Sequence, residues 1–134
     1  MKTHVLTGAT SGIGAALARA LAERGDRLVL LARGEASAEA LAADFPQAQV
    51  LLADLADPGT LNGLGRQVDG PVDSLLHVAG VVELGPVSRL RLHDWEKQLS
   101  VNLTSPAVLT REFLPHLRTS SGIVVFVNSS AGLT

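Results

Sequence analysis

Three glycines in a short stretch separate an apolar run from an amphipathic helical pattern near the start of the chain. Residues 7–14 read TGATSGIG, and the preceding run, residues 4–7, is predicted to be a β-strand. After the glycines, apolar side chains recur with the spacing of one helix face, at Ile13, Ala16, Leu17, Ala20 and Leu21. A glycine-rich turn from strand to helix lets the backbone approach a phosphate, and the helix start offers unpaired N–H groups. This feature predicts an α/β unit that binds a nucleotide.

Each glycine of the turn has a predicted task. Gly8 turns the chain sharply off the strand, Gly12 leaves room for a pyrophosphate, and Gly14 lets the helix pack closely. The alternative is a glycine loop shaped by packing alone, and the lack of a following Gly-Lys-Ser/Thr argues against a P-loop. The candidate cofactor-binding residues of the turn are Gly8, Thr10, Ser11, Gly12, Ile13 and Gly14.

Strand-like and helical patterns alternate along the rest of the chain. Further strands are predicted at residues 28–31, 50–53, 72–78 and 123–127. Three further helices are predicted. One follows from the apolar stripe Ala38, Leu41, Ala42 and Phe45, and another begins at Asp57-Pro58, with Leu61, Leu64 and Val68 facing inward. The third is a long helix at residues 94–118. This alternation indicates a parallel α/β sheet. Together with the glycine-rich turn after the first strand, it predicts a Rossmann-type doubly wound α/β fold, which implies the strand order 3-2-1-4-5.

The composition excludes several classes of protein. The 134 residues fit a single domain, and 46% hydrophobic against 18% charged residues predicts a folded chain. A net charge of −2 gives no attraction to nucleic acid or anionic membranes, and no apolar run approaches the roughly 18 residues of a membrane span. There is no cysteine, and His4, His93 and His116 lack ligand spacing, so no metal site is predicted. Together with the lack of a signal peptide, this indicates a cytoplasmic protein.

Several landmarks together resemble the short-chain dehydrogenase/reductase family. Residues 7–14 are similar to its Thr-Gly-x-x-x-Gly-x-Gly turn, and Asp54-Leu55 resembles its adenine-contacting pair. Ala79-Gly80 resembles the end of its Asn-Asn-Ala-Gly motif, although His77 and Val78 replace the two asparagines. We interpret His77 as a hydrogen-bonded core histidine.

The segment after the second predicted strand bears on the cofactor. NAD-binding Rossmann proteins place an acidic residue there, whereas this chain has Ala32 and Arg33. An arginine can pair bidentately with a 2′-phosphate, and family members with arginine here usually prefer NADP. NADP is therefore favoured. NAD stays open because Glu35 is close and Arg33 could simply be solvated.

Two residues resemble part of the family's catalytic site. Pro106 lacks the N–H that would pair with the carbonyl of Asn102, so the long helix is expected to bend there. The family's active-site asparagine sits at such a bend and its carbonyl holds a water. Residues 128–132 resemble the segment with the catalytic serine, which the spacing places at Ser129, with Ser130 as a competitor. The alternatives to these catalytic roles are that Asn102 only faces a polar groove and that Ser129 only caps the end of a strand.

The resemblance implies a larger enzyme than this chain can form. The family's general acid is a tyrosine followed by a lysine four residues later, and this chain contains no tyrosine. We therefore expect residues 1–134 to be an incomplete NAD(P)-binding Rossmann domain, truncated after the fifth strand and inactive by itself. The intact protein is expected to be an NADP(H)-dependent oxidoreductase that transfers hydride between nicotinamide and a carbonyl or alcohol substrate. The alternative is a non-catalytic dinucleotide-binding sensor or scaffold.

Association between copies is also predicted. The fifth strand is apolar at every position, so it should need cover on both faces and self-associate where it is left uncovered. Trp95 is expected to anchor the long helix within the subunit, unless that helix packs against a second subunit as it does in much of the family. A homo-oligomer is therefore expected.

Overall fold

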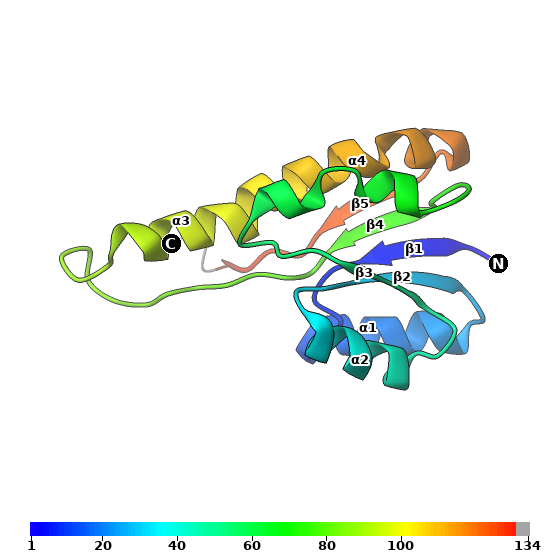
Figure 1. Cartoon of the computed structure of the whole chain (residues 1–134), viewed down its shortest axis with the longest axis horizontal. Helices are drawn as coiled ribbons and strands as arrows, with labels where there is room; N and C mark the ends of the chain where they lie inside the picture. The colour runs from blue at the N-terminus through cyan, green and yellow to red at the C-terminus, as the bar shows by residue number, and fades with distance from the viewer. Residues whose placement is uncertain (131–134) are drawn as a thin grey trace.

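The computed structural model describes residues 1–130 as one α/β unit built around a five-stranded parallel sheet (Figure 1). The strand order is β3-β2-β1-β4-β5, with every neighbouring pair parallel. The predicted doubly wound fold and its strand order are confirmed. The strands are β1 (Thr3–Leu6), β2 (Arg27–Ala32), β3 (Gln49–Leu52), β4 (Ser74–His77) and β5 (Ile123–Phe126).

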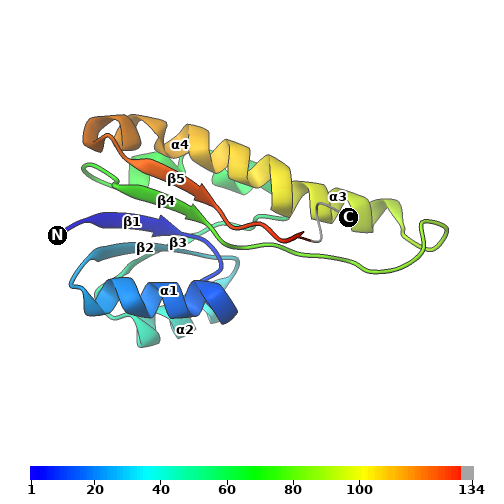
Figure 2. The ribbon, with the colours of Figure 1, turned by 180° about the vertical axis from the view of Figure 1, so that it is seen from behind.

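Helices cover both faces of this sheet. Figures 1 and 2 show α1 and α2 together on one face and the long α3–α4 rod on the other. The two faces have separate apolar cores, one centred on Leu6, Leu30 and Leu41 and the other on Leu75, Leu109 and Phe113. The helical elements are α1 (Gly12–Glu23), α2 (Glu35–Asp44), the 3-10 turns η1 (Pro58–Leu61) and η2 (Leu64–Gln67), α3 (Leu92–Leu99), the π-helical η3 (Ser100–Thr104) and α4 (Ser105–Ser120).

The buried face of α1 differs from the predicted stripe. The helix buries Gly14, Ala18 and Leu21, with Leu17 packed beside them. The prediction that Ile13, Ala16 and Ala20 face inward is wrong, and Ile13 is 64% exposed. A Cβ at Gly14 would lie 1.8 Å from the carbonyl oxygen of Gly8, so α1 can pack on its own turn only with this glycine turned inward. Hydrophobicity alone does not report that rotation, because a buried glycine contributes nothing to an apolar stripe. In α2, Ala42 is likewise exposed, whereas Leu41 and Phe45 are buried as predicted.

The helix predicted after Asp57 forms as two 3-10 turns, η1 and η2. The inward side chains are nevertheless as predicted, since Leu61, Leu64 and Val68 are all buried. Gly63 lies between the turns in the left-handed conformation, with φ at +84°, which interrupts a regular helix. An added Cβ at Gly65 would lie 2.3 Å from the Glu112 carbonyl oxygen, so η2 packs on α4 through bare backbone.

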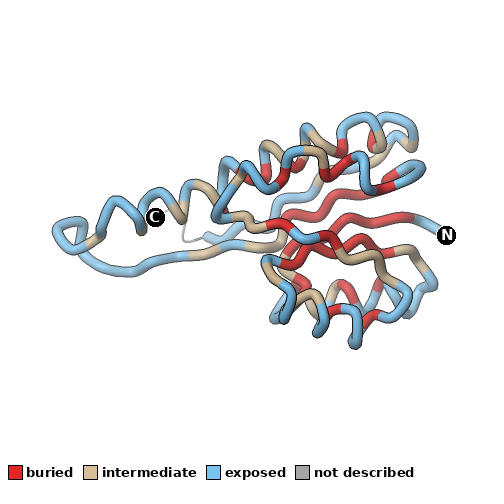
Figure 3. The backbone as a smooth tube through the Cα atoms, viewed as in Figure 1, coloured by how far each residue is buried: buried red, intermediate tan, exposed pale blue. Residues whose placement is uncertain are grey.

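The long predicted helix is interrupted where Pro106 removes a hydrogen-bond donor. The π-helical segment η3 contains Asn102 and separates α3 from α4, so the regular hydrogen-bond pattern of the helix is broken at this place. The bend expected there stays a prediction. Trp95 is 44% exposed, so it does not anchor α3 within the subunit as predicted. Figure 3 shows the α3 end of the rod as largely exposed, in contrast to the buried central strands. None of the helices in residues 1–130 is long and apolar enough to cross a membrane.

β5 is an edge strand with unusually exposed apolar side chains. Val124 packs against the core beneath α4. Ile123 and Val125 point to the opposite face because side chains alternate along a strand, and they are 60% and 37% exposed. Figure 2 shows α1 and α2 on that face beneath β1, β2 and β3, away from β5. Within residues 1–130, the outer edge of β5 and its face opposite α4 are therefore uncovered, where the sequence predicted further cover.

Candidate nucleotide-binding site

The glycine-rich turn is held between the carboxyl ends of β1 and β4. The hydroxyl oxygen of Thr7 accepts hydrogen bonds from the N–H groups of Val78 and Ala79, each 3.1 Å long. Gly8 follows with φ at +77°, and a Cβ there would lie 2.9 Å from the nitrogen of Ala79. The sharp turn predicted at Gly8 is therefore present, and it brings the start of the loop against Ala79.

The other two glycines have contrasting surroundings. A Cβ at Gly14 would lie 1.8 Å from the carbonyl oxygen of Gly8, so the first turn of α1 packs directly on the loop. Gly12 has φ at +56° and faces open space. Ser11 is the N-cap residue of α1, and its side chain makes no capping hydrogen bond. The helix therefore begins at an open position where a phosphate group could meet its first N–H groups.

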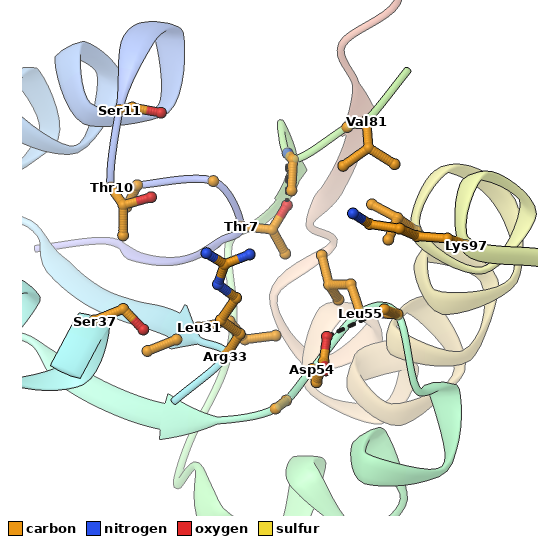
Figure 4. A pocket seen from close by; sticks show the side chains of 18 residues that line it. Thr7, Thr10, Ser11, Leu31, Arg33, Ser37, Asp54, Leu55, Val81 and Lys97 are labelled. Atoms are coloured by element: carbon orange, nitrogen blue, oxygen red, sulfur yellow. Dashed lines mark hydrogen bonds between the residues drawn. The ribbon is translucent and has the colours of Figure 1, made fainter. Parts of the chain in front are cut away.

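A cavity of about 450 Å³ lies beside this turn, at the carboxyl ends of the strands (Figure 4). It brings together most of the predicted cofactor-binding residues, from four separate segments of the chain. Gly12, Ile13 and Gly14 are outside the lining and form the start of the adjoining α1. The predicted residues in the lining are Gly8, Thr10, Ser11, Arg33, Asp54, Leu55, Ala79 and Gly80.

The wall after β2 carries the residue predicted to select the cofactor. Arg33 is exposed, and its guanidinium group makes no hydrogen bond or ion pair with any other side chain or backbone group of residues 1–130. Figure 4 shows its guanidinium group at the cavity. The neighbouring Ser37 is already used locally, because its hydroxyl donates to the carbonyl of Gly34 and accepts the Gly34 N–H. Arg33 is thus the cation on this wall with its donors available to an anion.

The segment after β3 is fixed by two hydroxyl groups. Thr60 accepts a hydrogen bond from the Asp54 N–H, and the fully buried Ser105 donates to the Leu55 carbonyl at 2.6 Å. The Asp54 carboxylate accepts the N–H of Ala56 at 2.9 Å. These contacts hold the side chain of Leu55 in the cavity wall, where an apolar ring could pack against it.

The two predicted catalytic residues do not line the cavity. The amide of Asn102 makes two hydrogen bonds to the backbone of Val81, donating to its carbonyl at 2.7 Å and accepting its N–H at 2.9 Å. Asn102 thereby fixes the segment that follows Ala79 and Gly80, and Val81 is itself in the lining. Ser129 is exposed and follows β5, at the same end of the sheet as the glycine-rich turn.

The interpretation of His77 is confirmed. This side chain is 4% exposed, and its Nε2 lies 2.9 Å from the hydroxyl of Thr110. That hydroxyl donates to the carbonyl of Pro106, so Nε2 carries the proton and donates to Thr110. Burial lowers the pKa of His77 to about 4.

The structure also adds cavity residues that the sequence analysis did not select. Thr7 is the first residue of the glycine-rich motif and Val81 follows Ala79-Gly80, whereas Lys97 and Val101 come from α3 and η3. Lys97 and Val101 are four residues apart, on one helix face, in the turn before Asn102. The sequence spacing indicates that Lys97 and Val101 share one helix face. It does not indicate that this face lies near the glycine-rich turn.

The fold and cavity define a class: a doubly wound α/β domain with a nucleotide-binding turn at the carboxyl end of its first strand. The model of the short chain dehydrogenase family matches residues 2–134, and the chain belongs to this family. A short chain dehydrogenase of Pseudocercospora fijiensis is 36% identical over 96% of this chain and 45% of its own length. The D-threitol dehydrogenase of Mycolicibacterium smegmatis is 37% identical over 77% of this chain and 42% of its own length.

The same relationship appears among solved structures. A short-chain dehydrogenase from Sphingobium yanoikuyae, solved in complex with NADPH, superposes with a TM-score of 0.88 at 30% identity. The match covers all of this chain and 56% of that protein. The chain therefore spans about half the length of the relatives that it matches.

Proposed function

We propose that this chain supplies the NADP(H)-binding part of an oxidoreductase that transfers hydride between nicotinamide and a carbonyl or alcohol carbon. The observation that carries the proposal is the juxtaposition, in one cavity, of the glycine-rich turn and the unpaired Arg33. The turn would hold the diphosphate through main-chain N–H groups of residues 8–14, and Arg33 would pair with a 2′-phosphate. Asp54, Leu55, Ala79 and Gly80 would surround the adenosine. Membership of the family and the relative solved with NADPH support this assignment.

The cofactor choice is tested with one pair of variants. Arg33→Ala is expected to weaken NADPH binding about tenfold or more and leave NADH binding unchanged, because the contact is to the 2′-phosphate. Arg19→Ala is the matched control, since Arg19 is an exposed arginine of α1 outside the cavity lining. Dissociation constants from calorimetric titration give the answer. An unchanged ratio of NADPH to NADH affinity in Arg33→Ala would refute the NADP assignment.

Asn102 and Ser129 are proposed as parts of the catalytic site of the complete enzyme. Ser129 would donate a hydrogen bond to the substrate oxygen and stabilise the charge that develops on it. Asn102 would hold a water of the proton relay on its main-chain carbonyl, which faces the position where Pro106 lacks an N–H. The bound nicotinamide would supply the hydride chemistry. Because the chain has no tyrosine, it lacks the family's general acid, and we expect it to bind NADPH without oxidising it in the presence of aldehydes or ketones.

Self-association is proposed through the uncovered β5. Its outer edge has no strand partner within residues 1–130, and its exposed side chains Ile123 and Phe126 are apolar. An exposed apolar edge strand is a template for pairing with another chain. We propose that two copies pair along β5.

A further inference from the structure

Lys97 extends from α3 to the cavity that the glycine-rich turn borders (Figure 4). Its side chain is 38% exposed, and its ammonium nitrogen lies 3.9 Å from a carboxylate oxygen of Glu83. Glu83 is 44% exposed and belongs to the segment between β4 and α3. A long ion pair between two exposed side chains holds its partners weakly. Lys97 is therefore a cation at the cavity that can leave Glu83 for another anion at little cost in free energy.

The charges of the cavity wall favour an anion. Two cations line it, Arg33 from the end of β2 and Lys97 from α3. Asp54 is the one acidic residue in the lining, and its carboxylate already accepts the N–H of Ala56. Two positive groups on separate walls of one concave surface raise the local concentration of a ligand with several negative charges.

We infer that Lys97 is a second cationic contact for a phosphate group of the bound dinucleotide, and that Glu83 is its counter-ion while that phosphate is absent. The inference rests on the proposed function, because it requires a dinucleotide in this cavity. An ammonium on a four-carbon stem reorients at little cost, and a phosphate accepts charge-assisted hydrogen bonds that outweigh an exposed ion pair. Lys97 also lies one helical turn before Val101, so its stem lines the cavity together with the Val101 side chain.

The test compares the removal of this charge with the removal of a distant one. Lys97→Met keeps the length of the side chain, and Lys2→Met is the matched control because Lys2 is exposed at the opposite end of β1 from the cavity. Three ligands are compared. Adenosine carries no phosphate, ADP-ribose carries the diphosphate, and 2′-phospho-ADP-ribose carries both the diphosphate and the 2′-phosphate. We expect Lys97→Met to weaken binding of a phosphorylated ligand about tenfold, to reduce the salt dependence of that binding, and to leave adenosine binding unchanged.

The ligand series identifies the phosphate. An equal loss for both phosphorylated ligands indicates the diphosphate, whereas a loss confined to 2′-phospho-ADP-ribose indicates the 2′-phosphate. Glu83→Gln should raise the affinity of the affected ligand two- to threefold, and it should have no effect in the Lys97→Met background. Unchanged binding in Lys97→Met, with wild type binding both ligands, would overturn the inference and leave the proposed function intact. Failure of wild type to bind either ligand would refute the proposed function itself.

Discussion

The imidazole of His77 stacks on the phenyl ring of Phe126, with the ring centroids 4.7 Å apart and the planes 19° from parallel. The two residues are register partners on the parallel strands β4 and β5. The same imidazole donates to Thr110 on α4, so His77 links the edge strand to the helix that covers it. The imidazole of His77 is buried, and its charge depends on pH.

We predict that His77 makes the chain less stable in mild acid. Its pKa is about 4 in the folded chain against 6.5 for an ordinary histidine, so the unfolded state binds more protons between these values. The free energy of unfolding should therefore fall as the pH drops from 6.5 to 4, by at most about 3 kcal/mol. Urea unfolding across this range measures the effect. His77→Asn should flatten the dependence and His93→Asn, at an exposed site, should preserve it. Equal slopes in wild type and His77→Asn would contradict the prediction.

Two glycine variants should separate folding from binding. Gly14→Ala places a methyl group 1.8 Å from the Gly8 carbonyl oxygen, so we expect a loss of stability of at least about 3 kcal/mol, or no folding. Gly12→Ala meets no atom within 4 Å and costs about 1 kcal/mol for its positive φ. It should stay folded but bind NADPH weakly, because the methyl group enters the open space in front of the turn. Normal NADPH affinity in a folded Gly12→Ala would show that no ligand approaches this position.

Charge on the edge strand should disrupt the proposed pairing of two copies. Val125→Lys places an ammonium group on β5, at a side chain that is 37% exposed and faces away from α4. We expect light scattering during size-exclusion chromatography to show a concentration-dependent dimer for wild type and a monomer for Val125→Lys. Leu103→Lys is the control, because Leu103 is 63% exposed on the α3–α4 rod. A dimer lost with Leu103→Lys and kept with Val125→Lys would assign the contact to the rod.

The sheet was predictable because its determinants are local in the sequence. Apolar runs specify the strands, and a turn such as residues 7–14 implies a right-handed crossover to a parallel neighbour. The burial of individual helix positions was less predictable. Ile13 and Ala20 are apolar yet exposed, because the rotation of α1 depends on a backbone contact at Gly14. A glycine has no apolar side chain, so this contact does not appear in the hydrophobic pattern of the sequence.

The predictable part of the cavity came from residues that adjoin strand ends. The carboxyl ends of parallel strands meet at one edge of a sheet, which brings Gly8, Arg33, Asp54 and Ala79 together. Lys97 could not be found in this way, because its place depends on where α3 lies relative to the strand ends after a long irregular segment. Nothing between residues 81 and 91 specifies that placement in a local pattern.

The central claim is that main-chain N–H groups of residues 8–14 hold the diphosphate of a dinucleotide. Amide chemical shifts of the ¹⁵N-labelled chain, followed during titration with NADPH, test it directly. We predict that the largest saturable shifts occur at the amides from Gly8 to Gly14, with smaller ones at Arg33 and Ala79. Saturable binding that leaves those amides unmoved, and shifts residues elsewhere on the sheet, would contradict the account.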